Sequence, residues 1–356
     1  MKVDCIIVGQ GICGTFLSWQ LQKAGRTFMV WDDGQPQTAS KTAAGIINPV
    51  TGRRIVKTWM IDLLLPDACT SYQTLGREFG CSFIEEISTV DFFPTPQMRL
   101  AFTDRLGEEA QYLQLPENEN MWRAVFNYDF GFGKINFCYL VDLPALLNAY
   151  RQKLIGSHQL RADRFRLENM FLRGKGIQME DIEADYIIFC DGMGSVENPY
   201  FRQLPFAPNK GEALLVNIKD FPARQVFKRG ISIVPWKEDI YWVGSSYEWK
   251  FDHALPTAGF RSRIEQQLSE WLKIPFEVVD HIAAIRPATI ERRPFVGFHP
   301  VYPQVGILNG MGTKGCSLAP YFSKQLADWI SSHTPILAQV DIHRYRQLLS
   351  QTTTGN

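Results

Sequence analysis

A group of glycines near the start of the chain, followed by an aspartate, has the spacing of an anion-binding site. The apolar run 5–8 leads directly into the motif Gly9-Gln10-Gly11-Ile12-Cys13-Gly14, and Asp32 follows the next apolar run, 27–31. Glycines let the backbone approach a pyrophosphate, and a helix that begins at Ile12 presents its N–H groups and the positive end of its dipole. A carboxylate at Asp32 can accept hydrogen bonds from both ribose hydroxyls and repels a 2′-phosphate. The pattern therefore predicts a dinucleotide site for FAD or NAD rather than NADP.

The residues around this motif supply the context that such a site requires. Apolar side chains recur every three or four positions from Ile12 to Ala24, as in a helix packed against a sheet. A strand before the motif, a helix after it and an acid at the end of the next strand favour dinucleotide binding. A glycine turn in an ordinary βαβ unit is the alternative interpretation.

Two other apolar runs end in glycine-rich turns. Residues 184–190 lead into Asp191-Gly192-Met193-Gly194-Ser195, and residues 305–308 lead into 309–315 and then into a helix with one apolar face. A continuous apolar run that ends in glycines is typical of a parallel strand that meets a ligand at its carboxyl end. A further helix is predicted over 141–154 from its apolar spacing.

The sequence between these runs predicts a second domain. Residues 50–141 and 200–283 are rich in aromatics, with strand-like runs separated by polar turns, as in an antiparallel sheet. We therefore predict an α/β protein with a discontinuous, Rossmann-type cofactor domain and an α+β substrate domain whose sheet is mainly antiparallel. The predicted cofactor domain comprises 1–49, 142–199 and 284–350, and the substrate domain comprises 50–141 and 200–283.

Composition narrows the class of protein. The 356 residues are 45% hydrophobic and 21% charged, so the chain can bury a sizeable core. Basic and acidic residues balance at 37 each, which gives no electrostatic case for nucleic acid or an anionic membrane. No apolar run approaches the ~20 residues that span a bilayer, and the apolar run at the N-terminus is too short for a signal peptide.

Cysteine and histidine usage points to a reduced compartment without a metal site. The seven cysteines are odd in number and include no CxxC pair, which favours free thiols and a cytoplasmic location over a disulfide framework. The six histidines show no metal-ligand spacing. We predict surface or loop positions for these histidines and no metal site.

Three separated segments resemble the FAD-dependent D-amino-acid oxidase superfamily. They look most like its branch with glycine oxidase, sarcosine oxidase and the oxidase half of the bacterial tRNA methylaminomethyl-uridine enzyme. The first segment is the glycine motif with Asp32, and the second is 39–49, which is similar to the family's loop beside the flavin ring. The third is 285–297, followed by 309–320, which is similar to the family's closing Arg-Pro block and last glycine-rich turn.

The resemblance implies a tightly bound FAD, which would make the discontinuous domain an FAD-binding domain. Covalently flavinylated sarcosine oxidases carry a cysteine where this chain has Ala284, so we expect non-covalent FAD. The expected cofactor-binding residues are Gly9, Gly11, Ile12, Cys13, Gly14, Asp32, Asp33, Ser40, Thr42, Ala44, Gly45, Ile46, Gly192, Gly310, Gly312, Thr313, Lys314 and Gly315.

Two cations are the expected catalytic residues. Lys314, at the start of the last predicted helix, would stabilise negative charge on a reduced flavin together with the helix dipole; a solvated loop lysine is the alternative. Arg286 would orient a substrate carboxylate or the loops that face the flavin, or else it is a structural arginine bound to Glu291 or to backbone carbonyls. The second choices for a carboxylate ligand, which also fit a solvated charge cluster, are Arg53, Arg54 and Lys57.

The resemblance implies oxidation of the C–N bond of a small amine or amino acid by hydride transfer to flavin N5. Flavin-dependent oxidation of a modified tRNA nucleoside is one alternative: the tRNA-modifying relatives have a basic residue aligned with Lys314, whereas glycine oxidases have an arginine aligned with Thr313. A non-catalytic, flavin-bound subunit of a heteromeric dehydrogenase is another. We expect a small-molecule partner and no membrane, and the balanced charge argues against nucleic acid. The oligomeric state is left open.

Overall fold

The chain forms two compact units, each built from segments distant in sequence. The structure is a computed structural model that describes residues 1–221 and 224–351. The first unit contains Met1–Ala43, Leu143–Asn209 and the chain from Ile285 onward; the second contains Ala44–Asp142 and Lys210–Ala284. The predicted roles of these parts, cofactor binding and substrate binding, stay predictions.

A mainly parallel sheet lies at the centre of the first unit. Strand β1 (Lys2–Val8) pairs in parallel with β2 (Phe28–Trp31) and with β12 (Ile182–Phe189), and β12 pairs in parallel with β19 (Val305–Asn309). Val8 lies opposite both Trp31 and Phe189, and Phe189 lies opposite Ile307. These strands therefore end at one level, and the loops that follow them share the carboxyl edge of the sheet, where open α/β sheets bind ligands.

Short strands extend this sheet on both sides. The parallel strand β9 (Leu160–Arg161) pairs with β2. Antiparallel pairings add β10 (Met170–Arg173) and β11 (Gly176–Met179) next to β12, and β18 (Phe295–Phe298) next to β19. Burial of the side chains between these strands and the surrounding segments forms the core of the first unit.

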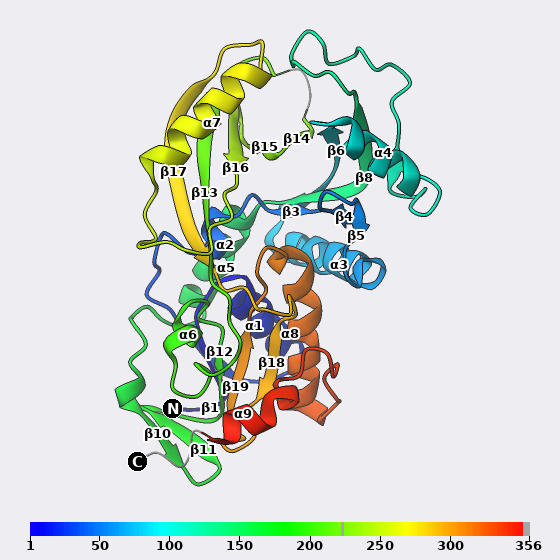
Figure 1. Ribbon diagram of the computed structural model, residues 1–356. Coiled ribbons are helices and arrows are strands. Elements are labelled where there is room, and N and C mark those ends of the chain that lie inside the picture. The colour runs from blue at the N-terminus through cyan, green and yellow to red at the C-terminus, as the bar shows by residue number, and fades with distance from the viewer. Residues whose placement is uncertain (222–223, 352–356) are drawn as a thin grey trace. The chain divides into compact units, whose positions relative to one another are not determined.

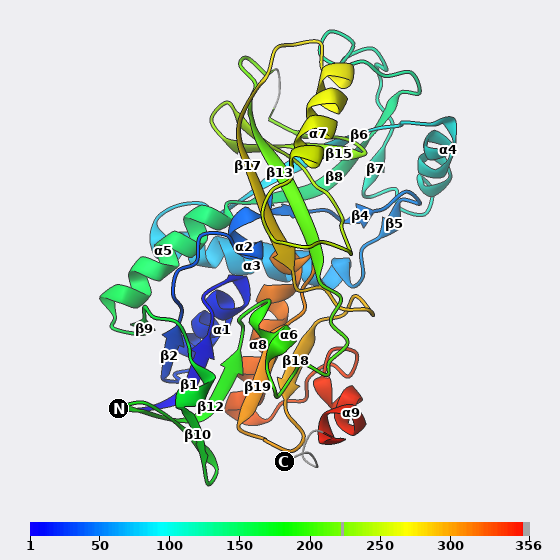
Figure 2. The same cartoon turned by 60° about the vertical axis from the view of Figure 1, so that its left-hand side comes forward.

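Helices cover the sheet of the first unit. Helix α1 (Ile12–Lys23) is buried from residue 12 to residue 21 and packs beside α8 (Gly315–Ser332) and α5 (Leu143–Gly156), as Figures 1 and 2 show. The short helices are α2 (Ala39–Thr42), η1 (Leu167–Asn169), α6 (Gly194–Glu197), η2 (Ile342–Tyr345) and α9 (Arg346–Ser350). Helix α1 is buried on all faces over residues 12–21, including Thr15, Ser18 and Gln20, which is more than the single apolar face that the spacing from Ile12 predicted.

The second unit is built around a large, mostly antiparallel sheet. Its main strand order is β17-β13-β16-β15-β14-β6-β8-β3. Strand β14 pairs with β6 in parallel, whereas the pairs β13–β16, β14–β15, β15–β16, β3–β8 and β6–β8 are antiparallel. The strands are β3 (Ile46–Ile47), β6 (Ile84–Phe92), β7 (Leu113–Gln114), β8 (Phe132–Val141), β13 (Asn209–Asn217), β14 (Val226–Arg229), β15 (Ile231–Lys237), β16 (Ile240–Gly244) and β17 (Glu277–Arg286).

Helices and a small hairpin complete the second unit. The helices are α3 (Ile61–Phe79), α4 (Pro96–Arg105) and α7 (Ala258–Trp271), and the hairpin pairs β4 (Val50–Thr51) with β5 (Val56–Lys57). The predicted fold class, α/β with a second, mainly antiparallel sheet, is confirmed. Among the helices that the structure describes, none combines the length and apolar character needed to cross a bilayer.

One histidine, His281, departs from the surface or loop positions that we predicted, and a second, His299, lies in a loop but is buried. His281 lies within β17, with its Nε2 3.0 Å from an oxygen of the buried Glu212 carboxylate. His299 follows β18 in a loop but is only 1% exposed, and its Nδ1 accepts a hydrogen bond from the N–H of Val301 at 3.2 Å. Burial lowers the pKa of His299 to about 4, which keeps the ring neutral.

Candidate cofactor and active site

The glycine motif after β1 forms a cradle that only small residues fit. A Cβ on Gly14 would lie 1.9 Å from the carbonyl oxygen of Gly9, and Gly9 itself has φ +97°. A Cβ on Gly11 would lie 3.1 Å from Oγ of Ser40, the hydroxyl that accepts a hydrogen bond from the N–H of Ile12 at 3.1 Å. The first turn of α1 has backbone N–H groups without intrahelical partners, so this cradle suits an anion.

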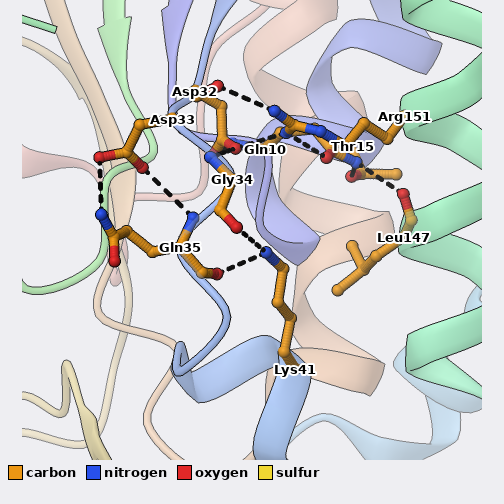
Figure 3. A network of polar contacts seen from close by, with 9 residues as sticks. All are labelled: Gln10, Thr15, Asp32, Asp33, Gly34, Gln35, Lys41, Leu147 and Arg151. Carbon is orange, nitrogen blue, oxygen red and sulfur yellow. Dashed lines mark hydrogen bonds and ion pairs between the residues drawn. The ribbon is translucent and has the colours of Figure 1, made fainter. Parts of the chain in front are cut away.

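The carboxylate of Asp32 follows β2 at the same edge of the sheet. Its Oδ2 accepts a hydrogen bond from the backbone N–H of Gln10 at 2.8 Å, and its Oδ1 accepts one from the N–H of Gly34 at 2.8 Å (Figure 3). Asp33, next to it, is exposed and accepts hydrogen bonds from Gln35. Asp32 therefore faces the glycine motif, whereas Asp33 stays at the surface.

An arginine from α5 joins Asp32. The guanidinium of Arg151 lies with its Nη1 2.6 Å from Oδ1 of Asp32, and its Nη2 donates to the backbone carbonyl of Asp32 at 3.1 Å. Sequence analysis missed this residue. The apolar residues of α5, including Leu147 and Tyr150, indicate which face of the helix is buried, and position 151 borders that face. An arginine beside the buried face of a helix could have indicated a buried carboxylate partner.

A polar cluster joins the ends of β12 and β19. The side-chain amide of Asn309 donates to the carbonyl of Gly192 at 2.8 Å and to the hydroxyl of Ser195 at 2.9 Å. Ser195 in turn donates to the carboxylate of Asp191. Burial raises the pKa of Asp191 to about 6. Of these residues, the sequence singled out only Gly192 for the site, because the contacts of the others depend on two strands meeting.

The last glycine turn leads from β19 into α8. Gly310 and Gly312 have positive φ values of +79° and +56°, and Thr313 is exposed. Lys314 occupies the N-cap position of α8, directly before Gly315. Partial burial and the nearby charges of the arginines at 293 and 292 lower the pKa of the Lys314 ammonium. A desolvated cation at a helix N-terminus makes this turn a second candidate anion site in the first unit.

Arg286 is the last residue of β17 and belongs to the first unit. Its Nη1 donates to Oδ1 of Asn209 at 2.7 Å, and Asn209 is 2% exposed. Glu291, the partner considered from sequence, instead pairs with Arg344 at 3.5 Å. The half-buried guanidinium of Arg286 is thus held in place by a buried amide.

The remaining predicted residues divide between the two units. In the first unit, Cys13 is buried, and Oγ1 of Thr42 donates to the carbonyl of Thr38 at 3.0 Å. In the second unit, a Cβ on Gly45 (φ +80°) would lie 2.0 Å from the carbonyl oxygen of Val141. Ala44 and Ile46, which we also predicted to bind the cofactor, lie beside Gly45 at the start of the second unit.

The second choices for a carboxylate ligand lie in and around the β4–β5 hairpin of the second unit. Arg53 and Arg54 are exposed, and Nζ of Lys57 is 2.6 Å from the Asp62 carboxylate. Of these cations, Lys57 therefore already has a carboxylate partner. Within residues 1–221 and 224–351, no cluster of three His, Cys, Asp or Glu side chains could hold a metal ion.

Comparison with known proteins identifies the family. The family described as FAD dependent oxidoreductase, DAO, matches residues 4–329. The chain belongs to this family. It is 28% identical to the glycine oxidase of Pseudomonas aeruginosa, over 95% of this chain and 97% of that protein.

Two solved structures share the fold. The glycine oxidase of Bacillus cereus has a TM-score of 0.79 at 16% identity and covers 94% of this chain and 96% of its own. The iminodiacetate oxidase of Chelativorans sp. has a TM-score of 0.75 at 19% identity and covers 96% of this chain and 98% of its own. Because the chain belongs to the FAD dependent oxidoreductase family, it is an FAD-dependent oxidoreductase, and the predicted FAD cofactor is confirmed.

The residues at the sheet edge fit the adenosine diphosphate part of FAD. The cradle at Gly9 and Gly14 excludes any Cβ, and the first turn of α1 opens at that cradle. The carboxylate of Asp32 lies beside it, bonded to the backbone of Gln10 within the motif. In dinucleotide-binding proteins with this glycine motif, the pyrophosphate binds at the helix N-terminus and the adjacent ribose binds to the carboxylate.

Proposed function

We propose that this protein oxidises the C–N bond of a small amino acid or amine. The relatives with this fold are named for glycine and for iminodiacetate, both small amino carboxylates. The observation that carries the proposal is Arg286, a half-buried cation held by the buried Asn209 in the same unit as the strand-edge cradle. Arginine is well suited to bidentate binding of a carboxylate.

We assign the parts of FAD to the predicted residues of the first unit. The pyrophosphate binds at the cradle of Gly9, Gly11 and Gly14, and the adenosine ribose binds at Asp32. The flavin ring would be held by the turn that contains Gly310, Gly312 and Lys314. Bound FAD supplies the hydride acceptor, flavin N5.

The side chains of this protein bind and orient the substrate in this assignment. Arg286 binds the substrate carboxylate and points the carbon that bears nitrogen toward the flavin, and such positioning alone supplies several kcal/mol. That carbon loses a hydride and the nitrogen loses a proton to water, which leaves an imine. Water then hydrolyses the imine to a carbonyl compound and a free amine or ammonia. Lys314 and the N-terminus of α8 stabilise the negative charge that accumulates at the flavin.

The test is an anaerobic screen of the purified yellow protein. Small amino acids and amines are added one at a time, and the visible absorbance of the flavin is followed. We expect at least one amino acid to bleach it, while the matching hydroxy acid, with oxygen in place of nitrogen, does not. A flavin that no amine bleaches, in a protein that co-purifies with a partner subunit, would favour a non-catalytic role; bleaching only by modified tRNA would favour the nucleoside alternative.

We also infer that FAD is bound without a covalent link and that the protein is cytoplasmic. Ala284 supplies no thiol, and all seven cysteines are free, five of them buried. Burial raises the pKa of the Cys13 thiol to about 12, which disfavours the reactive thiolate. Denaturation should release a yellow supernatant, and flavin that stays with the precipitated protein would contradict the first inference. Fractionation of cells tests the second: recovery of the protein with the membranes or outside the cell would contradict it.

A further inference from the structure

Most hydrogen-bond acceptor sites of the Asp32 carboxylate are occupied by donors from the protein itself. An ionised carboxylate has about four lone-pair sites, two on each oxygen. The Oδ1 atom accepts from Nη1 of Arg151 at 2.6 Å and from the N–H of Gly34 at 2.8 Å. The Oδ2 atom accepts from the N–H of Gln10 at 2.8 Å. One lone pair, on Oδ2, remains for a ligand.

The arginine that occupies Oδ1 is itself held in place. The Arg151 and Asp32 side chains are each 19% exposed, so their ion pair is mostly screened from water. Nη2 of Arg151 donates to the backbone carbonyl of Asp32 at 3.1 Å, and Nη1 also approaches Oε1 of Gln10 at 3.3 Å. These contacts fix the guanidinium to both the strand end and the glycine motif.

Gln10 connects this arginine to the two helices beside it. Its Nε2 donates to the hydroxyl of Thr15 in α1 at 3.2 Å and to the carbonyl of Leu147 in α5 at 3.0 Å (Figure 3). Nζ of Lys41 donates to the carbonyl of Gly34 at 3.1 Å, which anchors the loop after Asp32. The network therefore leaves Asp32 little freedom to rotate.

We propose that Arg151 is a positioning residue that makes Asp32 an acceptor for one hydroxyl of the adenosine ribose instead of two. The single bond forms at Oδ2, because Oδ1 is filled by Arg151 and Gly34. A charge-assisted hydrogen bond to a carboxylate is strong and geometrically selective, so one hydroxyl contributes to affinity and the other does not. This inference rests on the proposed placement of the ribose at Asp32.

The test compares FAD with two analogues that lack one hydroxyl of the adenosine ribose, the 2′-deoxy and the 3′-deoxy forms. Apoprotein is titrated with each, and the change in flavin fluorescence gives the dissociation constant. We expect one analogue to bind about ten- to a hundredfold more weakly than FAD and the other to bind as tightly as FAD. This fold-change corresponds to the loss of one hydrogen bond to a charged group. Equal weakening with both would overturn the inference while leaving the ribose at Asp32.

An outcome in which neither analogue is weakened would have a different meaning. Asp32→Asn then decides between the two proposals. If this variant also binds FAD as the parent does, the ribose does not bind at Asp32, and both the placement and the inference fail. If it binds FAD more weakly, the placement stands and the one-hydroxyl inference alone is overturned.

Variants of Arg151 test the cause. Arg151→Met frees a lone pair on Oδ1, so we expect both analogues to bind more weakly than FAD in this variant. Arg151→Lys keeps a cation and should restore the difference between the analogues, which a merely structural role for the arginine does not predict.

The matched control is Arg161→Met. Its guanidinium pairs with Asp181 in the same unit, but the two side chains are 41% and 62% exposed. In this control variant, one analogue should still bind more weakly than FAD and the other should bind as FAD does. A difference between the analogues that is unchanged in Arg151→Met would overturn the role of Arg151. If that variant fails to fold, the analogue series in the parent protein still decides the one-hydroxyl claim.

Discussion

Arg286 is held at the end of β17 by a hydrogen bond to the buried side chain of Asn209. If Arg286 binds the substrate carboxylate, Arg286→Ala removes a charge-assisted contact worth about 1.5–3 kcal/mol. We expect the KM for amino acids to rise about ten- to a hundredfold while the FAD content stays unchanged. Steady-state kinetics measure this, with substitution of the exposed Arg173 of the same unit by alanine as the control. Unchanged kinetics would remove Arg286 from the substrate site.

Lys314 lies at the start of α8, where partial burial and neighbouring arginines lower its pKa. If it stabilises the reduced flavin, Lys314→Met should make the flavin harder to reduce. A loss of about 1.4 kcal/mol corresponds to a two-electron potential about 30 mV more negative. Redox titration measures the shift, and the control is Lys324→Met on the same helix, where Lys324 is exposed and pairs with Asp328. Equal potentials in the two variants would make Lys314 an ordinary loop lysine.

Asp191 gives the protein a predictable pH dependence. Burial raises its pKa to about 6 in the folded state, above the ordinary value of 3.8. The folded state therefore holds a proton that the unfolded state releases between about pH 4 and pH 6, so this residue destabilises the fold progressively as pH rises through that range. Asp191→Asn removes the cost and should raise stability by about 3 kcal/mol at pH 8 and by about half as much at pH 5.

Thermal unfolding of the holoprotein between pH 5 and pH 8 tests this prediction. The control is Asp163→Asn, which changes an exposed carboxylate in the same unit. An Asp191→Asn variant whose stability relative to the parent is the same at both pH values would show that Asp191 has an ordinary pKa.

At the scale of elements, local sequence signals predicted the parts of the fold that depend on neighbouring residues. The strand before the glycine motif, the start of α1 at Ile12 and the strand that ends at Trp31 lie where apolar runs and glycines placed them. The helix predicted over 141–154 is α5, Leu143–Gly156. The turn from β19 into α8 also follows the sequence pattern.

Contacts between elements distant in sequence were not predicted. Arg151 meets Asp32 because α5 packs beside α1, and Asn309 meets Ser195 because β19 pairs with β12. The pKa of Asp191 depends on the burial that these pairings create. A single sequence shows residue types and spacing, but it does not show which long side chain crosses to which strand end.

Substitution of Gly14 tests whether the first turn of α1 must lack a side chain at this position. Alanine normally stabilises a helix relative to glycine by about 1 kcal/mol, but here its Cβ would lie 1.9 Å from the carbonyl oxygen of Gly9. The backbone must shift, so we expect Gly14→Ala to lose about 1–3 kcal/mol of stability and to bind FAD weakly. Gly156→Ala, where a Cβ meets nothing within 4 Å, is the control. Full FAD occupancy in Gly14→Ala would contradict the cradle.

At the scale of the whole molecule, the chain returns to the first unit twice after leaving it. The glycine motif, the Asp191 cluster and the Lys314 turn come from three separate segments, yet the parallel pairing of β1, β12 and β19 brings their strand ends to one edge. The second unit is inserted between these segments in two pieces. This organisation explains why residues from three separate segments of the first unit are expected to bind one FAD.

The oxidation of a C–N bond is tested most directly by the rate at which substrate reduces the flavin. The best substrate from the screen is prepared with hydrogen or with deuterium on the carbon that bears nitrogen, and each form is mixed with the holoprotein without oxygen at saturating concentration. If that hydrogen is transferred to the flavin, we expect the flavin absorbance to fall several-fold more slowly with the deuterated substrate. Equal rates for the two forms, or a flavin that no amine reduces, would contradict it.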